Sequence, residues 1–478
     1  MNKRKIISFI GKIMMIEAVL MVPSWLVALG YGDGDAKAFL YTIVPTLLIG
    51  FLCSRVRESD KRISGRDGYF IVAAAWMMIS LIGAVPLYLA GGFESYWGAL
   101  FEIVSGFTTT GASVLVRPED LGHGILFWRS FTHWIGGMGV LVFVLMVMPA
   151  DNDNSMHLVR AEVPGPTAGK LVPRMRTTSI ILYSIYGVMT ILLVALLYAG
   201  NMSLYDSFCI AFGTAGTGGF AVSSAGIAGY GSAYIEILLG IFMILFGINF
   251  NLYHLLLLGK VRDVLRSEEL RAYLGIITAA TVLIAINIFS QVLSVGKSLR
   301  DAFFQVSSII TTTGFATVDF NQWPEFSKHI LLLLMVIGAC AGSTGGGMKV
   351  SRVIILVKSL IAEVKQMISP KTIVTVRLEE KAVNKQVLNS TRIYAAAYLL
   401  LLCLFTLLLS LDGLDFESNF TAVLSCFNNI GPGLAAVGPM SNFSVYSDWA
   451  QVLLSVVMLT GRLEIFPMLL LFARSSHE

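Results

Sequence analysis

Charge is what this sequence has least of. Only 13% of the 478 residues are charged, while 56% are hydrophobic and the mean hydropathy is +0.76. A soluble chain of this length cannot hide so much apolar surface, so the composition excludes a soluble protein and indicates a polytopic membrane protein. The formal net charge of +4 is too small to predict nucleic-acid binding.

Cysteine and enzyme motifs are also scarce. No two cysteines form a CxxC pair, and there is no HExxH helix, no GxSxG elbow and no convincing acidic pair within the apolar runs. The sequence therefore predicts a protein that is not an enzyme and needs no cofactor. Each cysteine lies in or beside an apolar run, which predicts small buried hydrophobes: Cys53, Cys209, Cys340, Cys403 and Cys426.

Long apolar runs are abundant. A membrane-spanning helix needs about 20 mostly apolar residues. The first run has a basic start but no small-residue cleavage site, so we expect a retained helix instead of a signal peptide. Ten runs qualify: 6–30, 38–54, 69–90, 126–149, 178–199, 234–258, 272–295, 328–357, 392–411 and 449–473.

Four shorter apolar segments lie between these runs, at 97–107, 204–213, 300–310 and 417–427. They are too short to cross a bilayer. Such segments fit re-entrant half-helices, which a membrane tolerates where protein or a water-filled cavity satisfies the backbone.

The distribution of Lys and Arg predicts the orientation. One set of loops is basic and the alternating set is nearly free of basic residues. Basic loops face the cytoplasm, so both termini are expected inside and the half-helices enter from outside. The basic set includes Arg57, Arg266 and Lys365, and the other set includes Glu119, Asp319 and Asp448.

A repeat organises the chain. Thr-Thr-Thr-Gly occurs in "FTTTGAS" (107–113) and "ITTTGFA" (310–316), each after a half-helix, and "TAGTGGF" (214–220) and "NNIGPGL" (428–434) lie at matching places. We predict an all-α fold of four pseudo-symmetric units, each a span, a half-helix and a second span, around a central ion pore. The predicted boundaries are 1–66 for an extra pair of spanning helices, then units 67–160, 161–266, 267–385 and 386–478.

The four turns suggest cation chemistry. A half-helix ends with its partly negative terminus near mid-membrane, and a glycine-containing turn can aim its carbonyl oxygens at a dehydrated cation. The alternative is that glycine and threonine only let helices pack closely. Four matched glycines favour the pore: Gly111, Gly218, Gly314 and Gly431.

These motifs, with "FWRSFTHWIGGMG" (127–139), "GACAGSTGGGMKV" (338–350) and "GRLEIFP" (461–467), resemble the Trk/Ktr/HKT superfamily of potassium transporters. The extra N-terminal pair of spans resembles its TrkH branch. The resemblance implies a potassium-conducting subunit in which glycine at all four places goes with potassium selectivity. The second and fourth turns depart from Thr-Thr-Thr-Gly, so the symmetry is expected to be approximate. The implied potassium-binding filter is Thr108, Thr109, Thr110, Gly111, Ala215, Gly216, Thr217, Gly218, Thr311, Thr312, Thr313, Gly314, Asn428, Asn429, Ile430 and Gly431.

A glycine cluster interrupts the eighth apolar run. Each glycine costs about 1 kcal/mol relative to alanine inside a helix, so we predict a broken helix with a loop between its halves. The resemblance implies an intramembrane gate beneath the filter, and the alternative is a passive kink. The predicted gate is Gly342, Ser343, Thr344, Gly345, Gly346 and Gly347, together with Arg462.

Several polar residues lie in apolar surroundings. Arg462, inside the last span, either neutralises half-helix carbonyls or presents positive charge to the ion path, and the resemblance favours the second. Glu464 is expected to pair with a neighbouring unit. We interpret Arg129 as an interfacial arginine, His133 as a packed polar histidine and Glu102 as a support behind the filter.

Function and partners follow mainly from the resemblance. It implies potassium uptake across the bacterial cell (inner) membrane, a homodimer and a separate cytosolic TrkA-like nucleotide-binding regulator. The basic segment 349–392 either faces lipid headgroups or docks that regulator. The alternative function is a proton- or sodium-coupled potassium symporter, for which Glu102, Glu236 and Glu464 are the main intramembrane acids.

Overall fold

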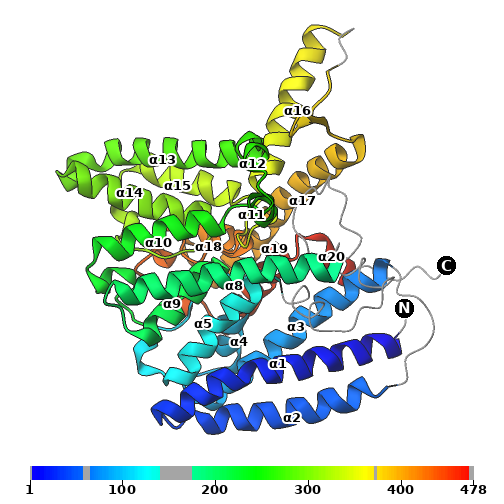
Figure 1. Cartoon of the computed structure of the whole chain (residues 1–478), viewed down its shortest axis with the longest axis vertical. Coiled ribbons are helices and arrows are strands. Elements are labelled where there is room, and N and C mark those ends of the chain that lie inside the picture. Colours follow the sequence, from blue (N-terminus) through cyan, green and yellow to red (C-terminus); the bar gives the residue numbers. More distant parts are fainter. Residues whose placement is uncertain (1–2, 57–64, 140–174, 371–373, 473–478) are drawn as a thin grey trace.

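The computed structural model describes residues 3–56, 65–139, 175–370 and 374–472, and these residues are mostly helical (Figure 1). The N-terminal pair, α1 (Lys3–Tyr31) and α2 (Ala36–Ser54), forms a hairpin of two helices that pack along each other. Parts of the predicted spans at 126–149 and 449–473, and Arg57 in a predicted basic loop, lie outside the described residues.

Four units of the same order follow the hairpin, which confirms the predicted fold class. The exact unit boundaries stay a prediction. The long first helices are α3 (Gly65–Leu89), α8 (Met175–Ala199), α13 (Glu268–Val292) and α17 (Lys385–Leu409). The short helices are α4 (Tyr96–Phe107), α9 (Leu204–Gly216), α14 (Val295–Ile310) and α18 (Phe416–Asn428).

Each short helix begins at a capping side chain. A Ser or Asp oxygen accepts a hydrogen bond from the backbone N–H three residues later, which satisfies a helix N–H that has no partner in the preceding turn. The four caps are Ser95, Ser203, Ser294 and Asp415. The helices are 12 to 16 residues long, so none crosses a membrane by itself.

The second helix of each unit stops early, after 13 to 15 residues. The prediction of continuous spans at 234–258 and 449–473 is therefore wrong. A break separates α10 from α11 (Phe250–Leu257) with a bend of 88°, and another separates α19 from α20 (Phe466–Phe472). The second helices are α5 (His123–Gly137), α10 (Ala233–Phe246), α15 (Glu325–Ile337) and α19 (Asp448–Arg462).

Glycines at the breaks explain two of the early ends. A Cβ at Gly136 would collide with the carbonyl oxygen of Phe107, and one at Gly461 with that of Phe427. These phenylalanines lie at the ends of α4 and α18, so each second helix stops where it touches the end of the short helix of its own unit. Among the described residues, six helices are long and apolar enough to span a membrane, or seven if the bent pair counts as one.

Most of the remaining helices and strands lie in the third unit. Residues 338–349 separate α15 from α16 (Val350–Ile368), which confirms the predicted broken helix. In Figure 1 the far end of α16 projects from the body of the molecule. A hairpin of β1 (Arg377–Leu378) and β2 (Lys381–Ala382) follows it, and α12 (Val261–Arg266) precedes α13. All five cysteines are free.

Short 3₁₀ helices occupy the connections. They are η1 (Pro118–Asp120), η2 (Ile227–Tyr230), η3 (Phe320–Gln322), η4 (Ser410–Asp412), η5 (Ala435–Val437) and η6 (Phe443–Val445).

Candidate functional site

Each short helix ends in a turn with the same backbone conformation. A residue with φ between 55° and 60° follows the helix, and a glycine with positive φ comes two residues later. Three of the first residues are threonines, for which a positive φ is a rare conformation that only surrounding contacts maintain. The pairs are Thr109 with Gly111, Thr217 with Gly219, Thr312 with Gly314 and Asn429 with Gly431.

This pattern shifts the alignment of the second turn. The sequence alignment matched residues 215–218 with 108–111, whereas the backbone matches 216–219. Gly219, with φ of 73°, therefore corresponds to Gly111, and Gly218 corresponds to Thr110. The sequence alignment was one residue out because "GTGG" offers two glycines after its threonine, and composition does not tell them apart.

The four turns form a closed ring. The glycine of each turn faces the next turn. A Cβ added to that glycine would collide with a carbonyl oxygen of the next turn, namely that of the residue just before its own glycine. The last turn contacts the first, so the cycle closes. Because backbone touches backbone at all four corners, each glycine is required by space as well as by conformation. The contacts join Gly111 with Gly218, Gly219 with Thr313, Gly314 with Ile430, and Gly431 with Thr110.

Hydroxyl and amide groups support three of the turns from behind. The side-chain oxygens of Thr108 and Thr110 lie 2.8 Å apart, and those of Thr311 and Thr313 lie at the same distance. In the fourth turn Asn429 Nδ2 donates to Thr110 Oγ1 at 3.0 Å and to Met458 O at 3.0 Å. The first and fourth turns are thus linked through side chains as well as backbone.

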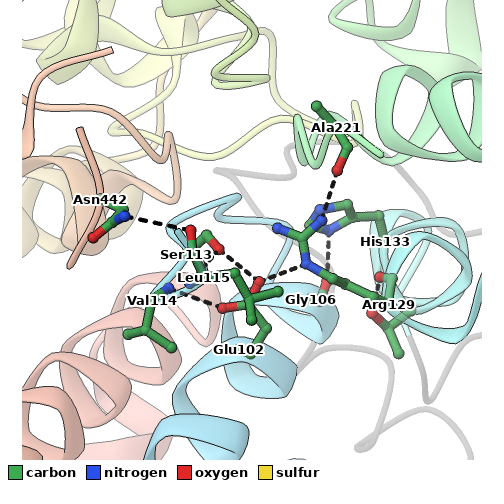
Figure 2. Close-up of polar contacts among 10 residues, drawn as sticks. Glu102, Gly106, Ser113, Val114, Leu115, Arg129, His133, Ala221 and Asn442 are labelled. Atoms are coloured by element: carbon green, nitrogen blue, oxygen red, sulfur yellow. Dashed lines mark hydrogen bonds and ion pairs between the residues drawn. The ribbon is translucent and has the colours of Figure 1, made fainter. Parts of the chain in front are cut away.

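A buried ion pair braces the first and second turns (Figure 2). Glu102 Oε1 accepts from Arg129 Nε at 2.5 Å and from the Ser113 hydroxyl at 2.9 Å, and Glu102 Oε2 accepts from Val114 N at 3.0 Å. Arg129 also donates to Ala221 O at 2.9 Å. Glu102 therefore holds the chain just after turn 1, as the sequence interpretation expected, and Arg129 reaches the chain just after turn 2.

The interpretation of Arg129 as an interfacial arginine is wrong, because its side chain is only 3% exposed. Its guanidinium lies 3.5 Å from the ring centroid of Phe220, which adds a cation–π contact. A charge removed from water needs a counter-charge and hydrogen bonds, and Arg129 has both. His133, one turn further along α5, is fully buried, and this agrees with the packed polar histidine that we expected.

Residues 338–349 lie directly against the ring. Gly346 N donates to Thr312 Oγ1 at 2.6 Å, and a Cβ at Gly346 would collide with Asn428 O. The same loop reaches the break in the second unit, where Thr344 Oγ1 donates to Phe246 O at 3.2 Å. The loop thus contacts two turns and the end of α10.

Two cationic side chains accompany this loop, Lys349, which is buried, and Arg462, which is half-buried. Lys349 Nζ donates to Gly345 O within the loop. Arg462 donates to Thr344 O at 3.0 Å and to the carbonyls of Gly136 and Gly137 at 2.5 and 2.9 Å. Arg462 therefore binds carbonyls at the C-terminal end of α5 and also reaches the glycine-rich loop, so the last unit is joined to the first and the third.

The intramembrane acids named from the sequence all pair with arginines. Besides Glu102, Glu236 lies 2.8 Å from Arg300, and Glu464 bonds Arg352 at 3.1 and 2.5 Å. Arg352 is on α16, so Glu464 does pair with a neighbouring unit. Glu17 was not among the acids named from the sequence, although it is a lone acid inside the first apolar run. Both Glu17 carboxyl oxygens are buried without a hydrogen-bond partner among the described residues.

The loop between α1 and α2 ties the N-terminal hairpin to the first unit. Asp33 Oδ2 accepts from His123 N at 2.7 Å and from His123 Nδ1 at 2.6 Å, and Asp35 Oδ2 accepts from Ile125 N at 3.1 Å. The hydrogen bonds from His123 lower the pKa of Asp33. On a nearby connection, hydrogen bonds from Ser224 to Glu119 lower the pKa of that carboxyl.

The fold and the ring define a class: a helical membrane protein in which four half-helix units of one chain surround a single axis. The sequence matches the TrkH family, described as a cation transport protein, over residues 35–286 and 276–477. The chain belongs to this family, and the resemblance seen in its motifs is confirmed.

Individual relatives match over almost the full length. The Trk system potassium uptake protein TrkH of Escherichia coli K12 is 34% identical, with 99% of each chain covered. The Trk system potassium uptake protein TrkG of the same organism is 32% identical, with 97% of this chain and 96% of TrkG covered. The crystal structure of the potassium transporter TrkH from Vibrio parahaemolyticus superposes with a TM-score of 0.89 at 32% identity, covering 99% of each chain. These relatives are transport proteins, a class that is not enzymatic.

Proposed function

We propose that this chain is the potassium-conducting subunit of an uptake system, and that the ring of four turns is its selectivity filter. The observation that carries the proposal is the closed cycle of glycine–carbonyl contacts, which gathers backbone oxygens from all four units. The relatives named as potassium uptake proteins support potassium as the ion. The proposed filter is 108–111, 216–219, 311–314 and 428–431, so Gly219 replaces Ala215 in the set expected from the sequence.

The chemistry is replacement of a hydration shell. A potassium ion that sheds water needs several oxygen ligands at once, and rings of backbone carbonyls supply them without a formal charge that would trap the ion. The four short helices point their partly negative C-terminal ends toward the turns, which favours a cation there. Glu102 holds the backbone that follows turn 1, and Arg129 holds the backbone that follows turn 2, so the pair fixes the positions of both turns.

The proposed gate is the loop of residues 342–347, with Arg462. The loop contacts the ring at Thr312 and at the backbone of Asn428. It lies on the side of the ring where the second helices of the units end, because it also contacts Phe246 at the end of α10. An ion that leaves the ring on this side meets the loop and the guanidinium of Arg462. Conduction then requires that the loop moves away from the ring. The hydrogen bond from Arg462 to Thr344 O is one of the contacts that hold the loop in place.

The remaining assignments concern the surroundings of the subunit. We propose a lipid bilayer location in the bacterial inner membrane with both termini in the cytoplasm, as the Lys and Arg distribution predicts. The relatives' names include the words "Trk system", which supports a multi-component assembly. A cytosolic TrkA-like nucleotide-binding regulator would dock near α16 and the β1–β2 hairpin, and the subunit would be a homodimer.

The test is potassium flux through the purified chain in liposomes. With potassium inside and an impermeant cation outside, we expect flux that collapses the potassium gradient and exceeds the sodium flux measured under matched conditions. Absence of potassium flux from folded protein, with and without a proton or sodium gradient, would contradict the proposal.

One observation favours a second candidate, coupled symport. A proton-coupled transporter needs a carboxyl that can take and release a proton inside the membrane, and Glu17 is buried with no hydrogen-bond partner in the part of the chain that the structure describes. The comparison that separates the candidates is potassium accumulation driven by an imposed pH gradient alone. Accumulation that disappears in Glu17→Gln would establish symport, whereas purely downhill flux in both proteins would establish a channel.

A further inference from the structure

The second turn lacks the support that the first and third possess. In those turns two threonine hydroxyls lie 2.8 Å apart behind the backbone. The corresponding positions of turn 2 are Gly216 and Gly218, which carry no side chain at all. A turn with glycines on both sides of Thr217 has more backbone freedom than its counterparts, so another group must restrict it.

His133 of α5 occupies the space of the missing side chains. A Cβ added at Gly218 would collide with the imidazole, whose Nδ1, Cγ and Cε1 are its three nearest atoms. A Cβ added at Gly216 would collide with the carbonyl oxygen of His133. Gly218 therefore leaves room for the imidazole of His133, whereas Gly216 leaves room for the backbone of α5 at the same residue.

The same histidine also contacts the first unit (Figure 2). Its Nδ1 lies 2.8 Å from Gly106 O, near the end of α4, and its ring centroid lies 4.2 Å from that of Phe220. A carbonyl oxygen only accepts, so Nδ1 carries the proton.

We propose that His133 is the positioning residue of turn 2 and a determinant of potassium selectivity, in place of the threonine pair of turns 1 and 3. This inference rests on the proposed filter function. Without the imidazole, residues 216–218 gain freedom, and the Gly218 carbonyl no longer presses firmly on Gly111. A looser ring can contract around the smaller sodium ion, so discrimination falls while conduction continues.

The experiment compares substitutions at both sides of the contact. His133→Ala empties the space, whereas His133→Asn keeps atoms at the places of Cγ and Nδ1, two of the three atoms nearest Gly218. Gly218→Thr restores the side chain of turns 1 and 3 but collides with the imidazole. The double variant His133→Ala/Gly218→Thr removes the collision, and His329→Ala, at an exposed histidine on α15, is the control.

Potassium and sodium fluxes are measured separately for each variant in liposomes. We expect His133→Ala and Gly218→Thr each to lower the potassium-to-sodium ratio by about tenfold, the ratio that corresponds to about 1.4 kcal/mol. His133→Asn and the double variant should stay within about threefold of the wild type, a difference below 1 kcal/mol. If His133 had only a general structural role, the His133→Ala protein would not regain its potassium-to-sodium selectivity when Gly218 is replaced by threonine.

Two results would overturn the inference. One is equal selectivity of His133→Ala and His133→Asn, because the ring then does not position the turn. The other is a double variant that folds and discriminates no better than Gly218→Thr. Folding is monitored by size-exclusion chromatography. If either threonine variant fails to fold, the comparison of the flux ratios of His133→Ala and His133→Asn tests the inference. Failure of the proposed function has a different signature, namely no potassium flux in the wild type itself.

Discussion

At the residue scale, the glycines of the ring have two distinct duties. Gly111, Gly219, Gly314 and Gly431 adopt positive φ and also face a neighbouring carbonyl. Gly218, in contrast, makes room for a side chain from another helix. The sequence could identify a glycine-rich turn in each unit, but it could not separate these duties, because both depend on contacts between residues far apart in the chain.

The first prediction concerns the ring glycines. Gly111→Ser adds a Cβ that collides with the Gly218 carbonyl, so we expect the potassium-to-sodium flux ratio to fall by roughly tenfold or more. Gly219→Ser should behave in the same way, through the Thr313 carbonyl. Gly275→Ser is the matched control, since nothing lies within 4 Å of a Cβ there. Wild-type selectivity in Gly111→Ser would remove turn 1 from the filter.

Arg462 supports a second prediction. Arg462→Ala removes a cation that contacts Thr344 and the carbonyls of Gly136 and Gly137. A positive charge beside a cation path raises the barrier for entry, so its loss should increase potassium flux about threefold to tenfold. Liposome flux is the measurement, with Arg392→Ala, at a half-exposed arginine paired with Glu363, as the control. Unchanged flux would mean that Arg462 is purely structural.

At the element scale, the second helices of the units were predicted better at their starts than at their ends. The four short helices begin at Ser or Asp caps, a local signal that the sequence carries. Two of the second helices, α5 and α19, end where a glycine meets the end of a short helix, a contact between segments that hydropathy cannot reveal. Only the break at 338–349 was predicted, because the four glycines of residues 342–347 act against a helix locally.

The glycine-rich loop leads to the third prediction. Deleting residues 343–346 removes the hydrogen bond to Thr312 and the contact with Asn428 while leaving the four turns intact. Potassium flux in liposomes should become faster, stay selective over sodium and lose any dependence on the proposed cytosolic regulator. Combined with Arg462→Ala, the increase should be larger than with either change alone. If flux of the folded deletion protein equals that of the wild type, the loop is only a kink.

The hairpin of α1 and α2 gives a prediction about pH. Asp33 has a lowered pKa because His123 donates to it, so its contribution to stability is present at neutral pH and is lost as the pH falls through that lowered pKa, below about 4. Asp33→Asn should reduce stability at pH 7 by on the order of 1 kcal/mol, as loss of a helix cap does.

Thermal unfolding in detergent is the measurement for Asp33→Asn. The difference in midpoint between the variant and the wild type should be present at pH 7 and shrink below about pH 4, where the Asp33 carboxylate of the wild type takes up a proton. Asp120→Asn is the control, because its contact with Arg117 is an exposed ion pair. A midpoint difference that does not shrink at low pH would show that the Asp33 charge is not what holds the hairpin.

At the scale of the whole molecule, the repeat was the most informative feature of the sequence. Four turns about a hundred residues apart predicted four units around one axis, and the closed cycle of contacts agrees with this arrangement. The order of neighbours around the axis follows the order along the chain. What the sequence could not provide were the connections between units, such as those of Arg462 with Gly136 and of Arg352 with Glu464.

Orientation is the prediction that belongs to this scale. In a background without the native cysteines, a cysteine at position 319 should react with an impermeant maleimide added to intact cells, and a cysteine at position 365 should react only after lysis. The Lys and Arg distribution is the reason, since basic loops stay in the cytoplasm. Labelling of position 365 in intact cells would invert the topology.

The closure between Gly431 and Thr110 has a consequence for biosynthesis. The last side of the ring comes from a segment that leaves the ribosome more than 300 residues after the first, so no partly synthesised chain can enclose the axis. Arg462, which fastens the last unit to α5, emerges later still. A nascent chain that stalls before Gly431 therefore lacks the fourth side of the ring and both contacts that this side makes with its neighbours.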